Sequence, residues 1–369
     1  MEMEKYYRDW LTLTQAKGIG PSLCHKLLLQ YSTPQNILNS NHAELHKCGL
    51  HQKNIQSLFE PEIKEIDRAI DWLQQKNHHL ITYHDPDYPE LLKSIYAPPP
   101  ILFAIGQREV INSLPFAIVG SRNPSATGRK LSEEFAFELA KSGLSICSGL
   151  ALGIDYHGHQ GALNAHSSTI AILGNGLDII YPARHKKIAQ QIAESGLLLS
   201  EFIPGTKPSP GNFPQRNRII SGMSLGVLVI EAAKKSGSLI TAHHALEQGR
   251  EVFAIPGSIH NPLARGTHSL IKQGAKLVET IDDILEELVP LASIIINKKS
   301  VTNQNINNGY DLDSEYQKLL DSMGYDVITI DQLVNSSGLT ADAVSSMLLI
   351  LELQGMIESR DGGKYCRCS

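Results

Sequence analysis

Short apolar runs alternate with helix-period segments through the middle of the chain. This pattern is typical of a parallel sheet that helices cover on both faces. It extends from about Leu80 to Leu288, and we set the bounds of the predicted α/β domain at residues 79–289. The predicted strands are Phe116–Val119, Ser145–Cys147, Thr169–Leu173, Leu197–Ser200, Leu225–Ile230 and Val252–Ile255.

Small residues follow several of these strands. Gly120, Ser148-Gly149, Gly174 and Pro256-Gly257 each stand directly after an apolar run. The carboxyl ends of parallel strands meet at one edge of a sheet, and ligands of open α/β sheets gather there. The repeated small residues therefore favour a rim on which a chain-like ligand lies close to the backbone, although structural turns also use glycine.

Residues 1–78 contain shorter helix-forming segments. Within them, Lys17-Gly-Ile-Gly-Pro-Ser22 precedes a leucine-rich helix, as in a helix-hairpin-helix, and Lys47-Cys-Gly-Leu-His51 is a weaker echo. The backbone amides of such a glycine turn can contact a DNA phosphate. The alternative, that the hairpins only pack helices together, stays open because basic residues are scattered there.

The C-terminal part predicts a second small domain. Residues 290–313 are rich in asparagine and predict a flexible linker, and residues 314–369 then read as three helices and a β-wing, the winged form of helix-turn-helix. The helix Thr340–Gln354, which would enter a DNA groove, contains no Lys or Arg and carries Asp342 and Glu352. We therefore expect this domain to contact a protein rather than duplex DNA.

The charge distribution is informative only locally. The chain of 369 residues is 42% hydrophobic and has a formal net charge of −5, so it is not broadly basic. Two windows nevertheless lack any carboxylate, namely 110–132 and 202–230. Their basic residues are Arg122, Arg129 and Lys130 in the first window and Lys207, Arg216 and Arg218 in the second. Both windows are predicted to be locally positive.

Two glycine or serine turns within the α/β domain predict anion sites. The first, Val119–Gly128, lies between a predicted strand and a helix, where backbone amides and the helix dipole favour a phosphate. It has neither the ending of a Walker A loop nor the spacing of the dinucleotide fingerprint, so no ATP, NAD or other cofactor is predicted. The second, Ser236–Thr241, opens a helix beside Lys234 and Lys235. A third basic stretch, Tyr181–Lys187, reads equally well as a solvated helix face.

The cysteines, the histidines and the apolar runs argue against certain functions and do not point to one. Five cysteines without zinc-knuckle spacing favour reduced thiols in the cytoplasm, and neither a signal peptide nor an apolar run of membrane-spanning length occurs. The histidines, of which His157, His159, His243 and His244 are the candidates, have no accompanying ligand pattern for a metal. We therefore expect no metal site and no contact with a membrane.

Five motifs occur in order along the α/β domain. They are Gly120-Ser-Arg122, Ser148–Asp155, Phe213-Pro-Gln-Arg-Asn-Arg218, Glu231–Ser238 and Pro256-Gly257. Together they resemble the DprA/Smf family of DNA-processing proteins. The resemblance implies an extended Rossmann-like core behind an N-terminal helix-hairpin-helix or SAM-like domain and in front of a winged helix. It also implies a cytoplasmic protein of natural transformation that forms a homodimer through this core, protects incoming single-stranded DNA and helps to load RecA recombinase.

Residue roles follow from the resemblance together with the chemistry of the side chains. Phe213 is expected to stack on bases, and Arg122, Arg216 and Arg218 to hold phosphates with help from the helix that begins after Asn123. The full predicted DNA-binding set is Gly120, Ser121, Arg122, Gly149, Lys207, Phe213, Arg216, Asn217, Arg218, Lys234, Ser236, Gly237 and Ser238.

Alternatives to these roles remain open. Arg122 could pair with Asp155, which we otherwise expect to orient backbone. Phe213 could be a core residue, with the two following arginines tying its loop to acidic neighbours.

Two other function classes compete with DNA binding. Similar cores occur in nucleotide-cleaving phosphoribohydrolases of the LOG type, but the matching place here, Glu231-Ala-Ala-Lys-Lys-Ser-Gly-Ser238, lacks their catalytic motif. Without a nucleophile and base in a known motif we expect binding and no catalysis. A mainly structural protein that docks a partner through the winged helix is the third possibility, and salt-insensitive behaviour toward oligonucleotides would distinguish it.

Overall fold

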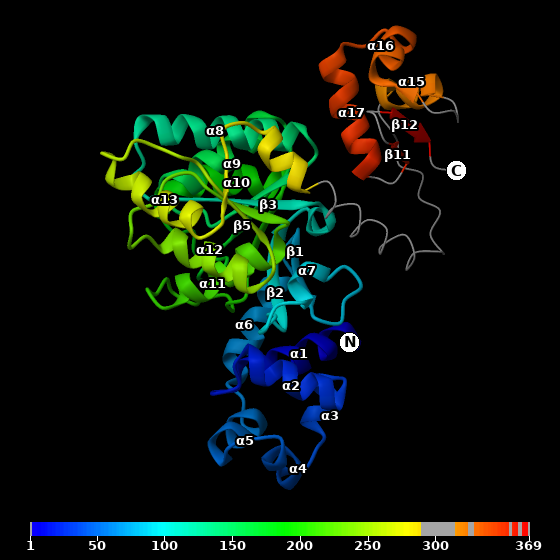
Figure 1. The fold of residues 1–369 in the computed structure, drawn as a ribbon. Coiled ribbons are helices and arrows are strands. Elements are labelled where there is room, and N and C mark those ends of the chain that lie inside the picture. Colours follow the sequence, from blue (N-terminus) through cyan, green and yellow to red (C-terminus); the bar gives the residue numbers. More distant parts are fainter. Residues whose placement is uncertain (1, 289–313, 324–327, 354–355, 361–363, 368–369) are drawn as a thin grey trace. The chain divides into compact units, whose positions relative to one another are not determined.

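The computed structural model describes residues 2–288, 314–323, 328–353, 356–360 and 364–367. The chain divides into two compact units, Met1–Glu279 and Thr280–Ser369 (Figure 1). The linker predicted at 290–313 lies outside the described residues. Among those described, no helix is both long enough and apolar enough to cross a bilayer.

The first unit begins with the short helices that the sequence predicts. They are α1 (Glu2–Gln15), α2 (Pro21–Tyr31), α3 (Pro34–Leu38), α4 (His42–Lys47), α5 (Gln52–Phe59) and α6 (Ile63–Leu73). The two predicted hairpin turns contain Gly18 with φ of +81° and Gly49 with φ of +97°. Glycine adopts this left-handed backbone without strain, which is why the turns between α1 and α2 and between α4 and α5 need it.

A nine-stranded sheet within the described residues follows these helices. Its order is β1-β2-β6-β5-β4-β3-β7-β8-β9, and the strands from β3 to β9 pair in parallel. The bounds are β1 (His78–Thr82), β2 (Ile101–Gly106), β3 (Pro115–Val119), β4 (Ser145–Ser148), β5 (Thr169–Ile172), β6 (Leu197–Ser200), β7 (Gly226–Val229), β8 (Glu251–Ala254) and β9 (Lys276–Leu277). The predicted parallel sheet and its strands are confirmed to within a residue or two at their ends.

The antiparallel strands β1 and β2 were not predicted. They pair with each other, and β2 pairs with β6. The segment between β1 and β2 holds only the four-residue helix α7 (Glu90–Lys93), which is too short to cross over a sheet as a parallel neighbour requires. The sheet is therefore antiparallel at the edge formed by β1 and β2 and parallel at its centre.

Helices cover both faces of this sheet, as the pattern predicts. They are α8 (Ala126–Lys141), α9 (Ile154–Asn164), α10 (Lys186–Ser195), α11 (Asn212–Met223), α12 (Gly237–Glu247) and α13 (Arg265–Lys272), with short 3-10 turns η1 (Arg108–Asn112), η2 (Ala183–His185) and η3 (Pro262–Ala264). Strand alternation divides the core: Ile170 and Ile172 pack with residues of α11 and α12, whereas Ala171 packs with α10 and the N-terminal helices.

The order of the strands creates a switch point beside β3. From β3 the chain adds β4, β5 and β6 on one side, and it later adds β7, β8 and β9 on the other. A crevice forms where the strand order reverses, outside the carboxyl ends of the two central strands. Here those ends are Val119 of β3 and Val229 of β7. The predicted ligand rim therefore centres on the turns that follow these two residues.

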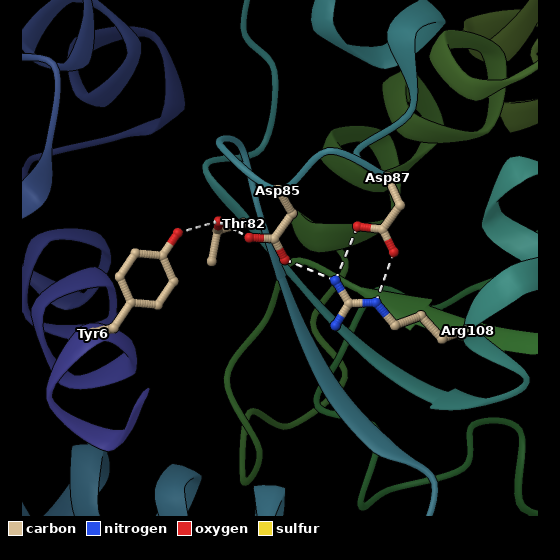
Figure 2. A network of polar contacts seen from close by, with 5 residues as sticks. All are labelled: Tyr6, Thr82, Asp85, Asp87 and Arg108. Atoms are coloured by element: carbon tan, nitrogen blue, oxygen red, sulfur yellow. Dashed lines mark hydrogen bonds and ion pairs between the residues drawn. The ribbon is translucent and has the colours of Figure 1, made fainter. Parts of the chain in front are cut away.

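A chain of polar contacts joins α1 to the edge of the sheet (Figure 2). Thr82 donates its hydroxyl hydrogen to Asp85 at 2.6 Å, so the Tyr6 hydroxyl, 2.8 Å away, is the donor to Thr82. Arg108 then donates to Asp85 at 2.8 Å and to both oxygens of Asp87 at 2.7 and 2.9 Å. The N-terminal helices are thereby attached to the sheet by side chains more than seventy residues apart in sequence.

The second unit contains the predicted winged-helix elements. Among the described residues from 314 onward, its helices are α15 (Ser314–Met323), α16 (Ile330–Ser337) and α17 (Ala341–Leu353), and its strands β10 (Ile328–Thr329), β11 (Ile357–Arg360) and β12 (Lys364–Arg367) form a sheet in the order β10-β12-β11. Leu319, Leu333, Leu348 and Leu351 are fully buried between these elements. Leu348 and Leu351 of α17 thus belong to the core of this unit.

Candidate nucleic-acid interface

The turn after β3 is built tightly into the switch point. The amide of Ser121 donates to the carbonyl of Glu231, after β7, at 2.7 Å. A Cβ on Gly120 would lie 2.6 Å from the Ile154 side chain, so only glycine fits there. Gly153 has φ of +81° and its missing Cβ would lie 2.3 Å from the carbonyl oxygen of Ser121. Both glycines let neighbouring loops pack under the turn and leave Arg122 at its exposed outer side.

Arg122 is brought together with Phe213, as the prediction of a shared site requires. The guanidinium carbon of Arg122 lies 5.5 Å from the centre of the Phe213 ring. This is within the usual range of a cation–π contact. In the part of the chain that the structure describes, Arg122 makes no hydrogen bond and no ion pair, and Asp155 does not pair with it directly. Its charge is therefore available to an anionic ligand.

A second aromatic ring extends this site. Tyr181, which is 47% exposed, lies 5.8 Å from Phe213 between ring centres, with an interplanar angle of 35°. Phe213 itself lies against Gly174 at the end of β5, where a Cβ would approach the ring to 3.0 Å. In the sequence, Tyr181 stands out only as the start of a basic stretch. The two rings are 32 positions apart, and no local pattern indicates their contact.

Arg216 does not face solvent as a phosphate contact would. Only 3% of it is exposed, and it donates to the carbonyl of Ile172 at the end of β5. A Cβ on Gly149 would lie 2.0 Å from its guanidinium, so Gly149 is small in order to admit Arg216. Burial lowers the pKa of Arg216 to about 10. The geometry thus does not support the prediction that Arg216 and Gly149 touch DNA. Both lie beneath the surface of the rim and support it.

Asp155 has the structural role that we expected. It accepts hydrogen bonds from the amides of Gly149 at 3.1 Å and Ala151 at 3.3 Å. Burial raises the pKa of Asp155, and the charge of Arg216 opposes that rise. The pair therefore stabilises the loop after β4 rather than presenting a charge to a ligand.

Arg218 also turns inward. It donates to the carboxylate of Glu201 and to the carbonyl of Ala97, and its side chain is only 13% exposed. The alternative in which arginines of this motif tie a loop to an acidic neighbour is correct for this residue. The sequence window without carboxylates had instead predicted that Arg218 holds a phosphate, because Glu201 stands just outside that window.

The start of α8 is not available to a phosphate. Glu231 accepts from the amide of Ser125 at 2.8 Å and from its hydroxyl at 2.6 Å, and the Ser125 hydroxyl accepts from Gly128 at 2.9 Å. The helix N-terminus, which favours an anion, is thus occupied by a carboxylate of the same chain. The expectation that this helix start assists a DNA phosphate is wrong.

The start of α12 is more open. Ser236 caps the helix and its hydroxyl accepts from the amide of Ser238, while a Cβ on Gly237 would meet no atom within 4 Å. Asn217 of α11 donates to the carbonyl of Gly237 at 3.3 Å, which joins the two helices. Lys234 is exposed beside them. Of the two predicted anion sites, this one keeps a free helix terminus.

The histidines hold no metal cluster in the described residues. No group of three or more His, Cys, Asp or Glu side chains there could ligate an ion. His159 is fully buried and its Nδ1 lies 2.7 Å from the Thr169 hydroxyl, which itself donates to the carbonyl of Ile146. His159 therefore donates to Thr169 and belongs to the core.

Comparison with known proteins identifies the family. The model described as DNA recombination-mediator protein A matches residues 79–289, which is more than half of the chain. The chain belongs to the DprA/Smf family. A second model of the same family, the DprA winged helix domain, matches residues 308–363. Protein Smf of Escherichia coli is 42% identical over 325 residues, which cover 86% of this chain and 85% of that protein.

Solved structures of the DprA/Smf family agree with the fold. The crystal structure of DNA processing protein A from Streptococcus pneumoniae is 35% identical with a TM-score of 0.68, and the match covers 76% of this chain and 98% of that one. DNA processing protein A from Helicobacter pylori, whose structure was reported for its single-stranded DNA binding mode, is 31% identical with a TM-score of 0.53 over 58% of this chain and 96% of that one. The predicted fold class and family resemblance are both confirmed.

Proposed function

We propose that this chain binds single-stranded DNA of any sequence along the rim at the carboxyl ends of β3, β5 and β7. One observation carries the proposal: the exposed guanidinium of Arg122 has no partner among the described residues and lies over the Phe213 ring. A phosphate can pair with the guanidinium while bases stack on Phe213 and Tyr181, and stacking accepts every base. Membership of the family, and the single-stranded DNA binding reported for the Helicobacter pylori relative, support it.

The predicted residues divide into two groups under this proposal. Exposed or half-buried positions contact DNA: Ser121, Arg122, Lys207, Phe213, Asn217, Lys234, Ser236 and Gly237, while the buried Ser238 supports them through its hydroxyl contact with Ser236. Buried positions shape the surface below it: Gly120, Gly149, Arg216 and Arg218. Tyr181 joins the first group because of its contact with Phe213.

The direct test compares fluorescent poly-dT with a matched duplex at two salt concentrations. The proposal expects tight, salt-sensitive binding that prefers the single strand and is weakened at least tenfold by Arg122→Ala, the equivalent of about 1.4 kcal/mol. Lys141→Ala is the matched control, because it removes one positive charge at the opposite end of α8. Equal losses in both variants, or no preference for the single strand, would contradict a specific site at Arg122.

The finer role is also a proposal. We infer that the chain acts in the cytoplasm during natural transformation, as a homodimer through the Rossmann-like core that protects incoming DNA and helps RecA to form filaments. Family membership supports this role. RecA-dependent ATP hydrolysis on DNA covered by a single-strand-binding protein should rise when the chain is added. Sedimentation equilibrium of the full chain should show a dimer.

The competing nucleotide-cleaving activity has less support. Glu231 opens the segment that corresponds to the catalytic motif of such enzymes. It is 8% exposed, and both of its carboxylate oxygens accept hydrogen bonds from Ser125. A general acid or base must reach its substrate, and this carboxylate is directed into α8. We therefore propose binding without turnover. Release of free base from nucleoside monophosphates by the purified chain is the result that would overturn it.

A further inference from the structure

A groove of about 250 Å³ lies between the N-terminal helices and the loop that follows β6. Apolar residues from both parts line it: Ile19 from the turn before α2, and Pro100 and Phe202 from the sheet domain. Gln15 and Gln215 bring side-chain amides to the same groove. A nucleobase combines flat apolar faces with a hydrogen-bonding edge, so it matches both parts of this lining.

Two exposed cations, Arg68 and Lys207, lie close to Thr206, which lines this groove. A Cβ on Gly205 would lie 2.6 Å from the guanidinium carbon of Arg68, which places this exposed residue of α6 against the loop. Lys207 is exposed two positions later, and Thr206 between them lines the groove. Across the described part of the chain neither cation has a hydrogen bond or ion pair, while the nearby Asp178 accepts the amide of Gly205 at 2.8 Å. These positive groups can bind phosphates.

The groove is continuous with the rim that carries Arg122. Phe213 lies against Gly174 at the end of β5. Two residues later in the same loop, the amide of Gly176 donates to the carbonyl of Thr206 at 3.0 Å. Gln215 of the groove lies on α11, two positions after Phe213. The loop after β5 therefore joins the position of Phe213 to that of Thr206.

The charge inside the groove selects which part of a nucleotide enters it. Glu201 lines the groove with a side chain that is only 6% exposed, and one of its carboxylate oxygens accepts from Arg218. The other oxygen is buried as well, and the nearby side-chain amide of Gln215 opposes the rise in the pKa of Glu201 that burial causes. A carboxylate in the wall repels a phosphate but attracts the N–H groups of a base edge. A cationic side chain of a protein partner would suit Glu201, yet the nearby Arg68 and Lys207 would repel it.

We propose that this groove receives one base of the bound strand, while Arg68 and Lys207 hold the adjoining phosphates. The inference rests on the proposed function, and it gives the N-terminal helical domain a direct part in DNA binding. The base lies between Ile19 on one side and Phe202 on the other, with its polar edge toward Gln15 and Gln215. The contact thereby lengthens the DNA track beyond the rim.

The test fills the groove without disturbing the fold. Gly20 lines the groove with extended backbone at φ of −79°, and a Cβ there would meet no atom within 4 Å, so the backbone accepts a side chain and Gly20→Leu adds one to the groove. Ser22→Leu is the matched control, because it adds the same side chain two positions later, at an exposed position on the first turn of α2 that does not line the groove. Affinity for poly-dT and photo-crosslinking of a 4-thiothymidine oligonucleotide are measured for both variants and for Arg68→Ala.

The groove predicts a specific set of results. Gly20→Leu should weaken binding about fivefold or more, as expected for the loss of one stacked base, and should abolish crosslinks to peptides that contain Ile19 or Phe202. Crosslinks to peptides that contain Phe213 should persist. Ser22→Leu should change neither. Arg68→Ala should lower the slope of log affinity against log salt by about 0.7, the value for one phosphate of a single strand.

Contrary outcomes separate the two proposals. Unchanged affinity and no groove crosslinks, with binding still dependent on Arg122, would overturn the groove and leave the rim intact. A complete lack of salt-sensitive binding to the unaltered chain would remove the proposed function itself. If Gly20→Leu abolished the effect on RecA but left DNA affinity unchanged, the groove would belong to a protein partner and the inference would be wrong.

Discussion

Glu231, two residues after β7, accepts hydrogen bonds from both the amide and the hydroxyl of Ser125 at the start of α8, at 2.8 and 2.6 Å. The contact joins residues 106 positions apart and bridges the switch point of the sheet. The contact is possible because residue 128 is a glycine. A Cβ on Gly128 would lie 2.5 Å from the Glu231 carboxylate. The chain thus occupies its own anion site at α8, and the proposed function therefore expects a DNA phosphate to bind elsewhere on the rim.

The first prediction concerns this contact. Glu231→Gln should lower the free energy of unfolding by about 1–2 kcal/mol, because the variant loses a charge-assisted hydrogen bond and a negative charge at a helix N-terminus. Affinity for single-stranded DNA should stay within twofold. Urea denaturation and the poly-dT titration measure the two quantities. Glu134→Gln, on the exposed side of α8, is the control. Normal stability combined with lost DNA binding would instead place Glu231 in the interface.

The second prediction separates the two arginines that were expected to act alike. Arg216→Met should reduce the free energy of unfolding by about 3–5 kcal/mol, because it removes the charge that compensates the buried Asp155. Arg122→Met should leave stability within about 0.5 kcal/mol, since its side chain is exposed and unpaired among the described residues, but should lose DNA affinity. Denaturation and binding curves of both variants decide it. Similar stability in both would mean that Arg216 is not a core support.

The contrast between these arginines shows what the sequence can and cannot predict. Apolar periodicity located the strands, because burial on both faces leaves a signal within each segment. The direction of a side chain depends on partners elsewhere: Arg218 meets Glu201 and Arg216 meets the carbonyl of Ile172. Neither pairing can be derived from local charge. Likewise, Tyr181 joins Phe213 only because the loop after β5 passes α11.

The third prediction concerns pH. Burial lowers the pKa of His159 to about 3, because the charged imidazolium would lose its hydration in the core. Its Nε2 also has no hydrogen-bond partner in the described structure that could stabilise the added proton. Unfolded His159 titrates near 6.5, so the unfolded state binds the proton first, and stability is lost as the pH falls from 6.5 toward 3. At pH 5 the loss relative to pH 7 should be about 2 kcal/mol.

A variant of His159 separates its contribution to the pH dependence of stability from those of the other histidines. The pKa values of His78, His84 and His185 are also lowered by burial, so the unaltered chain has several contributions of the same sign. His159→Gln should be less stable at both pH values, yet its loss between pH 7 and pH 5 should be smaller by about 2 kcal/mol. Urea denaturation at the two pH values gives the difference directly. An identical pH dependence in both proteins would show that His159 takes up a proton inside the fold.

The last prediction concerns the polar chain that attaches α1 to the sheet (Figure 2). Arg108 lowers the pKa of Asp87 mainly through its hydrogen bonds, and burial opposes this effect. A lowered carboxyl pKa contributes stability above its ordinary value near 4, and that contribution is lost as the pH falls through the folded value. Arg108→Met should therefore cost about 1 kcal/mol at pH 7, a value reduced because Arg108 is 31% exposed, and less at pH 3.

Tyr6→Phe serves as the matched variant for that experiment, because it breaks the chain at its neutral end and leaves the pairing of Arg108 with Asp87 intact. It should lower stability by about 0.5–1.5 kcal/mol, equally at pH 7 and pH 3, since no ionisable pair is removed. Hydrogen exchange of α1 should accelerate in both variants if this chain holds the helix to the sheet. Faster exchange throughout the sheet instead, with α1 no more affected than β3, would show that Arg108 supports the whole unit rather than the attachment of the N-terminal helices.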